Sequence, residues 1–152
     1  METIQDFEDM LFLLNKHGAK YLIVGGLAFI YHAKPRYTKS IDIWVEPSPK
    51  NVEKVNDALV EFGSPNLLTQ NHPEETLQIG IEPDRIDLLQ QLEGVKFTTA
   101  WKNRITDNYG DTASYWIAID DLIRAKEMID NARHQEDVRI LREVKKLHPK
   151  SE

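Results

Sequence analysis

One strand–turn–helix–strand stretch restricts the fold more than any other part of the sequence. The apolar run Tyr21–Val24 is typical of a short buried strand, and it ends at Gly25-Gly26. Residues 27–33 then have the composition of a helix, and residues 40–46 alternate between apolar and polar side chains, which predicts a second strand. Helix and strand so closely interleaved indicate a fold that mixes both.

Further helices and strands are expected on both sides of this stretch. Residues 3–17 carry apolar side chains at helical spacing, with Thr3 as the expected cap and Gly18 as the stop. Ser48-Pro49 predicts the start of another helix, which ends at Gly63. The other expected elements are strands over 76–82 and 85–89 joined by a turn at Pro83-Asp84, a strand over 114–119, a helix capped by Asp120, and a second C-terminal helix after a break at 131–134. Residues 95–108 are ambiguous.

These elements predict an α+β fold, with a small mixed β-sheet flanked by helices and a helical C-terminal segment. A chain of 152 residues is about one domain long. We therefore expect a single domain over 1–152, with a sheet-containing core over 1–119 and C-terminal helices over 120–148. The chain has no cysteine, which excludes disulfides, thiolate zinc sites and a cysteine nucleophile.

The charge balance and hydropathy narrow the possible partners. There are 19 basic and 25 acidic side chains, giving a net charge of −6 without a basic stripe, so duplex DNA is not an expected partner. The apolar runs are far shorter than the roughly 20 residues that cross a bilayer. The acidic N-terminus lacks the basic region of a secretory signal. We therefore expect a soluble, cytoplasmic protein with no membrane partner.

The Gly25-Gly26 pair lies where the first strand turns into a helix. The start of a helix has unpaired N–H groups and the positive end of the helix dipole, and both attract phosphate. Two residues without Cβ atoms also let the backbone approach a triphosphate closely. A plain strand-to-helix turn without a ligand explains the same pair.

Two aspartates stand on strands among apolar neighbours. Asp42 shares a strand face with Ser40 and Trp44, and Asp87 shares one with Arg85. A carboxylate inside a strand is disfavoured, so Asp42 is either a solvated edge residue or a metal ligand. If the two strands are adjacent, Asp42 and Asp87 can reach one divalent cation. Mg²⁺ prefers one or two carboxylates and completes its shell with water and phosphate oxygens, which suits in-line attack on a nucleotide.

Three pieces of sequence stand in a fixed order: Val24-Gly25-Gly26, a spacer over 27–39, and Ser40-Ile41-Asp42-Ile43-Trp44-Val45. This order resembles the nucleotidyltransferase signature of the polymerase-beta superfamily, which is a GG or GS pair, a spacer, and Asp-x-Asp on a strand. Arg36-Tyr37-Thr38-Lys39 resembles the Arg-x-Thr-x segment of small stand-alone members, such as the toxins of abortive-infection systems. Asp87 stands at the position of the third carboxylate. Residues 120–126 and 133–137 resemble the helical ending of the small-toxin group, so the likeness covers most of the chain.

The sequence departs from the family pattern at Ser40, where the first carboxylate of Asp-x-Asp should stand. Another register does not help, because Asp42 as first acid would put Trp44 at the second. Family members use these acids to hold two magnesium ions, one for the attacking hydroxyl and one for the triphosphate. A neutral hydroxyl is a poor substitute for a carboxylate as a ligand. Two carboxylates suffice for one Mg²⁺ with the phosphates, so nucleotide binding is better supported than turnover.

The resemblance implies a protein that binds an NTP with Mg²⁺ and transfers a nucleoside monophosphate to a hydroxyl acceptor, with activity impaired by Ser40. The acceptor would be a small molecule, a protein or tRNA. The alternative is an inactive binding module of the same fold, such as one component of a toxin–antitoxin pair with a protein partner. The expected site residues are Asp42, Asp87 and Ser40 for catalysis, Asp42 and Asp87 as metal ligands, and Gly25, Gly26, Arg36, Lys39 and Lys126 for nucleotide binding.

Several of these polar side chains also have plainer explanations. These are solvated loop charges for Arg36 and Lys39, an i, i+4 partner in Asp130 for Lys126, and an intrahelical pair between Arg133 and Asp137. The five histidines show no metal-ligand spacing, so no zinc site is expected.

Overall fold

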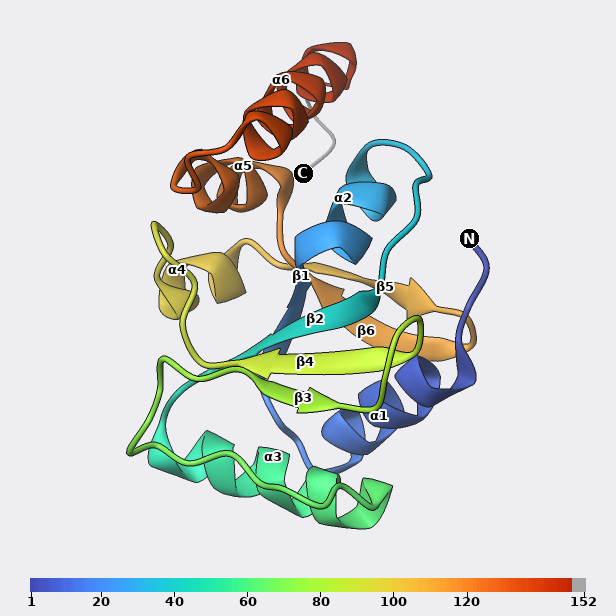
Figure 1. Ribbon diagram of the computed structural model, residues 1–152, viewed down its shortest axis with the longest axis vertical. Coiled ribbons are helices and arrows are strands. Elements are labelled where there is room, and N and C mark those ends of the chain that lie inside the picture. Colours follow the sequence, from blue (N-terminus) through green and yellow to red (C-terminus); the bar gives the residue numbers. More distant parts are fainter. Residues whose placement is uncertain (149–152) are drawn as a thin grey trace.

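A six-stranded mixed sheet, in the order β3-β4-β2-β1-β6-β5, organises the computed structural model (Figure 1), which describes residues 1–148. The strands are β1 (Tyr21–Val24), β2 (Ser40–Val45), β3 (Leu77–Ile79), β4 (Arg85–Leu89), β5 (Ile105–Tyr109) and β6 (Thr112–Trp116). The helices are α1 (Gln5–Lys16), α2 (Gly25–His32), α3 (Pro49–Phe62), α4 (Phe97–Lys102), α5 (Ile119–Glu127) and α6 (Ala132–Leu147). This architecture confirms the predicted α+β class with a small mixed sheet and a helical C-terminal segment. The predicted domain extends to residue 152, and its last four residues, 149–152, lie outside the described residues.

The two faces of the sheet form two apolar cores. In Figure 1, α1 and α3 lie on one side of the sheet, and α2, α4, α5 and α6 lie on the other. Ile41 and Ile43 pack toward α1 and α3, whereas Leu22 and Trp44 pack toward the other helices. The predicted alternation along β2 is therefore confirmed, and Trp44 is a core residue. Within residues 1–148, no helix combines the length and apolar character needed to cross a membrane.

Two of the predicted helix boundaries are confirmed and three are shifted. Ser48 accepts a hydrogen bond from the backbone N–H of Asn51 at 3.2 Å and caps α3, and Gly63 ends it with a φ of 94°. The helices α1 and α5 begin after Ile4 and Ala118, so the expected caps Thr3 and Asp120 are wrong. At α1 the packing prevails over the local signal, because Ile4 is partly buried against the core and its N–H donates to the Tyr109 hydroxyl at 2.8 Å. Helix α2 begins at Gly25, two residues earlier than expected.

The ambiguous residues 95–108 contain both a helix and a strand. They form α4 and most of β5, which the sequence did not predict, and β6 begins and ends earlier than the expected 114–119. Strand β5 is an edge strand whose middle residues, 106–108, are polar and exposed. Strand β5 is therefore defined by its pairing with β6 and not by an alternation of apolar and polar residues. Strand β3 is also shorter than the expected 76–82.

Asn51 joins the start of α3 to the start of β1 and the end of β2. Its side-chain oxygen accepts from the N–H of Lys20 at 2.7 Å, and its side-chain nitrogen donates to the carbonyls of Lys20 and Glu46 at 3.0 and 2.9 Å. The residue is 4% exposed. Buried polar groups left without partners cost free energy, so this one side chain holds three backbone groups in place.

We expect Asn51→Ala to lower the free energy of unfolding by about 2–4 kcal/mol, because these backbone groups lose their partners. Urea denaturation measures the change. The exposed Asn71→Ala serves as the control and should shift the free energy by less than about 0.5 kcal/mol. A loss at Asn51 as small as that of the control would contradict the assignment.

Candidate functional site

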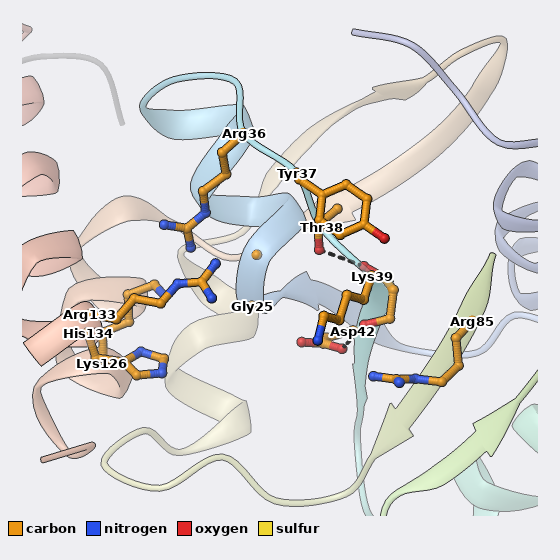
Figure 2. A pocket seen from close by; sticks show the side chains of 12 residues that line it. Gly25, Arg36, Tyr37, Thr38, Lys39, Asp42, Arg85, Lys126, Arg133 and His134 are labelled. Carbon is orange, nitrogen blue, oxygen red and sulfur yellow. Dashed lines mark hydrogen bonds between the residues drawn. The ribbon is translucent and has the colours of Figure 1, made fainter. Parts of the chain in front are cut away.

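A cavity of about 280 Å³ lies at the start of α2 (Figure 2). It is lined by Gly25, Gly26, Arg36, Tyr37, Thr38, Lys39, Ser40, Asp42, Arg85, Lys126, Arg133 and His134. All the predicted site residues except Asp87 are in this lining, and Asp87 lies beside Asp42 on the neighbouring strand. The cavity is thus formed by the start of α2, the segment before β2, the strands β2 and β4, and the helices α5 and α6.

The two glycines are required by close approach of other side chains. Gly25 has a φ of +65°, and a Cβ atom built there would lie 2.1 Å from Oδ2 of Asp42. A Cβ atom on Gly26 would lie 2.9 Å from Oγ1 of Thr38. The missing side chains therefore let the Asp42 carboxylate and the Thr38 hydroxyl lie against the first turn of α2.

Asp42 and Asp87 are direct neighbours. They are partners in the parallel register of β2 and β4, and β2 is flanked by β1 on its other side, so Asp42 is not an edge residue. The hydroxyl of Ser40 donates to Oδ1 of Asp42 at 3.1 Å. Burial, together with the negative charge of Asp87, raises the pKa of Asp42 to about 6. The negative charge of Asp42 is therefore incompletely balanced by its surroundings.

Arg85 binds both carboxylate oxygens of Asp87. Its Nε donates to Oδ1 at 2.9 Å and its Nη2 donates to Oδ2 at 3.0 Å, a bidentate arrangement. Asp87 is buried, and Arg85 lines the cavity. The sequence placed Arg85 on the face of Asp87 but did not identify it as a site residue.

A second ion cluster, formed by Arg36, Lys126 and Asp137, holds the segment before β2 against α5 and α6. Arg36 donates to the two oxygens of Asp137 at 2.7 and 3.0 Å, and Nζ of Lys126 donates to Oδ2 at 2.9 Å. Among the described residues, Lys126 thus pairs with Asp137 rather than with Asp130, and Asp137 pairs across helices rather than with Arg133. The crossing of α5 and α6 turns Asp137 toward α5, which i, i+4 spacing does not reveal.

This cluster holds more cations than carboxylates, and burial and ion pairing shift the pKa values of its members. Burial alone would raise the pKa of Asp137, but the hydrogen bonds from Arg36 and Lys126 hold it below its usual value. Burial lowers the pKa of Lys126, and its bond to Asp137 only partly offsets the effect. A single carboxylate therefore serves two cations, while the exposed Arg133 adds a third positive charge to the lining.

Two buried nitrogen atoms in the lining have no hydrogen-bond partner within residues 1–148. They are Nε of Arg36 and Nδ1 of His134. Figure 2 shows Arg36, Lys126, Arg133 and His134 gathered on one side of Gly25 and Asp42, with Arg85 on the other. Polar atoms without partners and surplus cations together make this side of the cavity suited to an anion.

Lys39 lines the same cavity, as expected for a nucleotide-binding residue. Its side chain is exposed, which also fits the plainer explanation of a solvated loop charge. Arg36 is no solvated loop charge, because it binds the buried Asp137 and its guanidinium lies 4.0 Å from the centre of the Phe29 ring. Sequence reasoning also missed Tyr37, Thr38 and His134 as lining residues. Only the Arg-x-Thr-x resemblance drew attention to Thr38.

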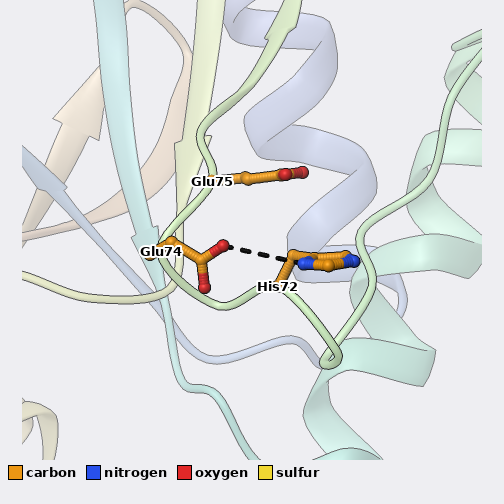
Figure 3. A group of neighbouring side chains, drawn as sticks. All are labelled: His72, Glu74 and Glu75. Atoms are coloured by element: carbon orange, nitrogen blue, oxygen red, sulfur yellow. Dashed lines mark ion pairs between the residues drawn. The ribbon is translucent and has the colours of Figure 1, made fainter.

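A separate group of side chains, His72, Glu74 and Glu75, lies on the segment before β3 (Figure 3). Nδ1 of His72 is 3.7 Å from a carboxylate oxygen of Glu74, and candidate ligand atoms of the three residues lie within 4.8 Å of one another. All three side chains are exposed, and none lines the cavity at α2. Exposed acidic groups are common without an ion, so we assign this one no role.

Solved structures of other proteins share the fold of this chain. No protein-family model matches the sequence, and the search of curated proteins gave no significant match. The crystal structure of the lincosamide antibiotic adenylyltransferase LnuA, bound to lincomycin, aligns with a TM-score of 0.57 and 16% identity over 94% of this chain and 99% of that chain. An antigenic nucleotidyltransferase-like protein from Paracoccidioides brasiliensis aligns with a TM-score of 0.51 and 11% identity over 93% of this chain and 77% of that chain. The chain therefore has the nucleotidyltransferase fold, as the sequence resemblance predicted.

We expect Asp137→Asn to lower the free energy of unfolding by about 3 kcal/mol at pH 7, because it leaves the buried Lys126 and the half-buried Arg36 without a counter-charge. The difference from wild type should be complete above about pH 4, the usual pKa of an aspartate. It should shrink as the pH falls through the lower pKa of the folded state, where wild-type Asp137 is itself protonated.

Urea denaturation of both proteins between pH 2 and 8 measures this dependence. Asp130→Asn is the matched control. It changes the exposed aspartate that helical spacing predicted as the partner of Lys126, and it should have little effect on the free energy of unfolding. A destabilisation by Asp130→Asn equal to that of Asp137→Asn, or one that does not change with pH, would contradict the assignment.

Proposed function

We propose that the cavity binds the phosphates of a nucleoside triphosphate and that the protein is nucleotidyltransferase-like. The observation that carries the proposal is the excess of positive charge from Arg36, Lys126 and Arg133 beside the start of α2. The likeness of fold to two nucleotidyltransferase structures supports it.

The first turn of α2 suits a phosphate on physical grounds. The N–H groups of a helix start have no partner within the helix, and the positive end of the dipole favours an anion. Glycine at positions 25 and 26 lets Asp42 and Thr38 lie against this turn, so a carboxylate stands beside the proposed phosphate site. Arg133 and Lys39, both exposed in the lining, can reach phosphate oxygens without breaking an ion pair of the fold.

The carboxylates suit a magnesium ion as donors. Mg²⁺ takes one or two carboxylates together with phosphate oxygens, and Asp42 lies in the same cavity as the proposed phosphate site. The raised pKa of Asp42 indicates an under-compensated negative charge, which a divalent cation would balance. We propose that Asp42, with Asp87 beside it, holds this ion. When bound, Mg²⁺ would neutralise charge on the phosphates and polarise them.

In the proposed reaction, a hydroxyl oxygen of the acceptor forms a bond to the α-phosphorus. The bond from that phosphorus to the oxygen bridging to the β-phosphate breaks, pyrophosphate leaves with the electron pair, and the hydroxyl proton passes to solvent. The acceptor belongs to one of three classes: a small molecule, a protein or tRNA. This chain contributes positioning and electrostatic stabilisation.

Ser40 limits this reaction. Its hydroxyl donates to Asp42 and brings no negative charge to the place where the family pattern has a carboxylate. Loss of a second metal ion removes several kcal/mol of transition-state stabilisation, and each ~1.4 kcal/mol is tenfold in rate. The same observation favours a second candidate, a binding module without turnover that acts with a protein partner, as in a toxin–antitoxin pair.

We expect the melting temperature to rise when an NTP is added, and to rise further with Mg²⁺, because a ligand that binds the folded state stabilises it. Thermal unfolding with ATP, GTP, CTP and UTP, each with and without Mg²⁺, measures the effect and the preferred base.

Arg133→Gln should weaken nucleotide binding about tenfold by removing a charge-assisted contact. Arg139→Gln, an exposed change on the same helix outside the cavity lining, should leave binding unchanged. Equal effects of the two variants would argue against the phosphate site.

We expect Ser40→Asp to raise the rate of nucleotide transfer by at least about tenfold, because it restores a carboxylate at the first metal position. The measurement uses NTPs labelled on the α-phosphate, with tRNA, protein and small-molecule fractions as acceptors. Nucleotide binding without transfer in both proteins would favour the binding module. If neither protein binds nucleotide nor transfers label, the proposed function is wrong.

A further inference from the structure

We propose that the guanidinium of Arg85 competes with a metal ion for Asp87. The carboxylate pair can then hold a single divalent ion, at Asp42. The inference deepens the proposed function and rests on it for the nature of the ion. It assigns Arg85 a positioning role, because its contact is with Asp87 and not with a reacting atom.

The contact between Arg85 and Asp87 uses both oxygens of the carboxylate. The donor distances are 2.9 Å from Nε to Oδ1 and 3.0 Å from Nη2 to Oδ2. Asp87 is 7% exposed and the side chain of Arg85 is 23% exposed, so the carboxylate is largely shielded from water while the guanidinium is half-buried. The planar fork of a guanidinium matches a carboxylate, and a shielded bidentate pair is stronger than an exposed one.

A metal ion on Asp87 would have to displace or share this guanidinium. Arginine cannot lose its proton in a protein, so Arg85 remains a competing cation at every working pH. Displacement would break two charge-assisted hydrogen bonds and leave the guanidinium with the exposed Glu82, whose carboxylate lies 3.5 Å from Nη1. Asp87 is therefore a much weaker metal ligand than its position beside Asp42 suggests.

The remaining donors are sufficient for one ion. Ser40 offers an uncharged hydroxyl that is engaged with Asp42, which leaves Asp42 as the one carboxylate not held by a cation in this group. The charges of Asp42, Asp87 and Arg85 sum to a single negative charge. Figure 2 shows Arg85 on the side of Asp42 opposite Arg36, Lys126 and Arg133. The charge of Arg85 therefore lies away from the cations that we propose to bind phosphate.

Metal binding without nucleotide tests the inference. Electron paramagnetic resonance of free Mn²⁺, titrated with the protein, gives the affinity and stoichiometry, and competition with Mg²⁺ shows that the same ion site is measured. Arg85→Gln should bind Mn²⁺ at least about tenfold more tightly than wild type. Arg139→Gln, which removes an equal charge far from Asp87, should have the wild-type affinity. A merely structural role of Arg85 predicts weaker metal binding on its removal, not tighter.

Two further variants keep the outcome interpretable. In an Asp87→Asn background, Arg85→Gln should give little or no gain, because the gain comes from freeing Asp87. If circular dichroism shows that Arg85→Gln does not fold, Arg85→Lys takes its place; it keeps the charge but loses the fork, and a gain of about threefold is expected.

Equal or tighter binding of Mn²⁺ by wild type than by the Arg85 variant would overturn the inference. So would the same gain in the Asp87→Asn background. Because the titration contains no nucleotide, its outcome is separate from that of the nucleotide-dependent thermal shift. A protein that binds NTP but shows no gain in Mn²⁺ affinity refutes the role of Arg85 alone, whereas one that gains Mn²⁺ affinity but never binds NTP refutes the proposed function.

Discussion

The parallel pairing of β2 with β4 fixes the positions of the two strand carboxylates of the site, Asp42 and Asp87. It brings Asp42 and Asp87 to the same level of the sheet, in the interior rather than at an edge. The positive φ of Gly25 and its lack of a Cβ atom then let the Asp42 carboxylate lie against the first turn of α2. Without this close approach, the acidic group and the helix start would be separate features of the fold.

The cationic side of the cavity depends on a different, long-range contact. Arg36 and Asp137 are 101 positions apart in the sequence, and their ion pair joins the segment before β2 to α6. Lys126 on α5 shares the same carboxylate. The C-terminal helices therefore complete the site as well as covering the sheet, and the shared carboxylate leaves positive charge in excess facing the acidic pair.

The elements that sequence reasoning predicted are those with local causes. The alternation along β2 and the Ser48 and Gly63 signals of α3 depend on neighbouring residues, and the structure confirms them. Strand β5 has a polar, exposed middle and depends on its pairing with β6, so no local pattern revealed it. The three hydrogen bonds of Asn51 to Lys20 and Glu46 had no local signal either, because they depend on where β1 begins and β2 ends.

The residues of the candidate site also divide into those with a local sequence signal and those placed by long-range packing. The glycines and the faces of Asp42 and Asp87 follow from short sequence patterns, and the family resemblance predicts that they form one site. The binding of Asp137 by Lys126 and Arg36, and of Asp87 by Arg85, depends on side-chain directions and helix crossings that spacing alone does not give. Local spacing predicted ion pairs of Lys126 with Asp130 and of Arg133 with Asp137. Helix packing instead brings Lys126 and Arg36 to Asp137.

The central claim is that one cavity places a nucleotide's phosphates between the start of α2, the cationic side chains and Asp42. A crystal structure grown with a non-hydrolysable NTP analogue and Mn²⁺ tests it most directly, because anomalous scattering locates the ion. We expect phosphate density beside Gly26 and Arg133, with one manganese peak at Asp42. Phosphates bound elsewhere on the protein, or manganese found away from Asp42, would contradict it.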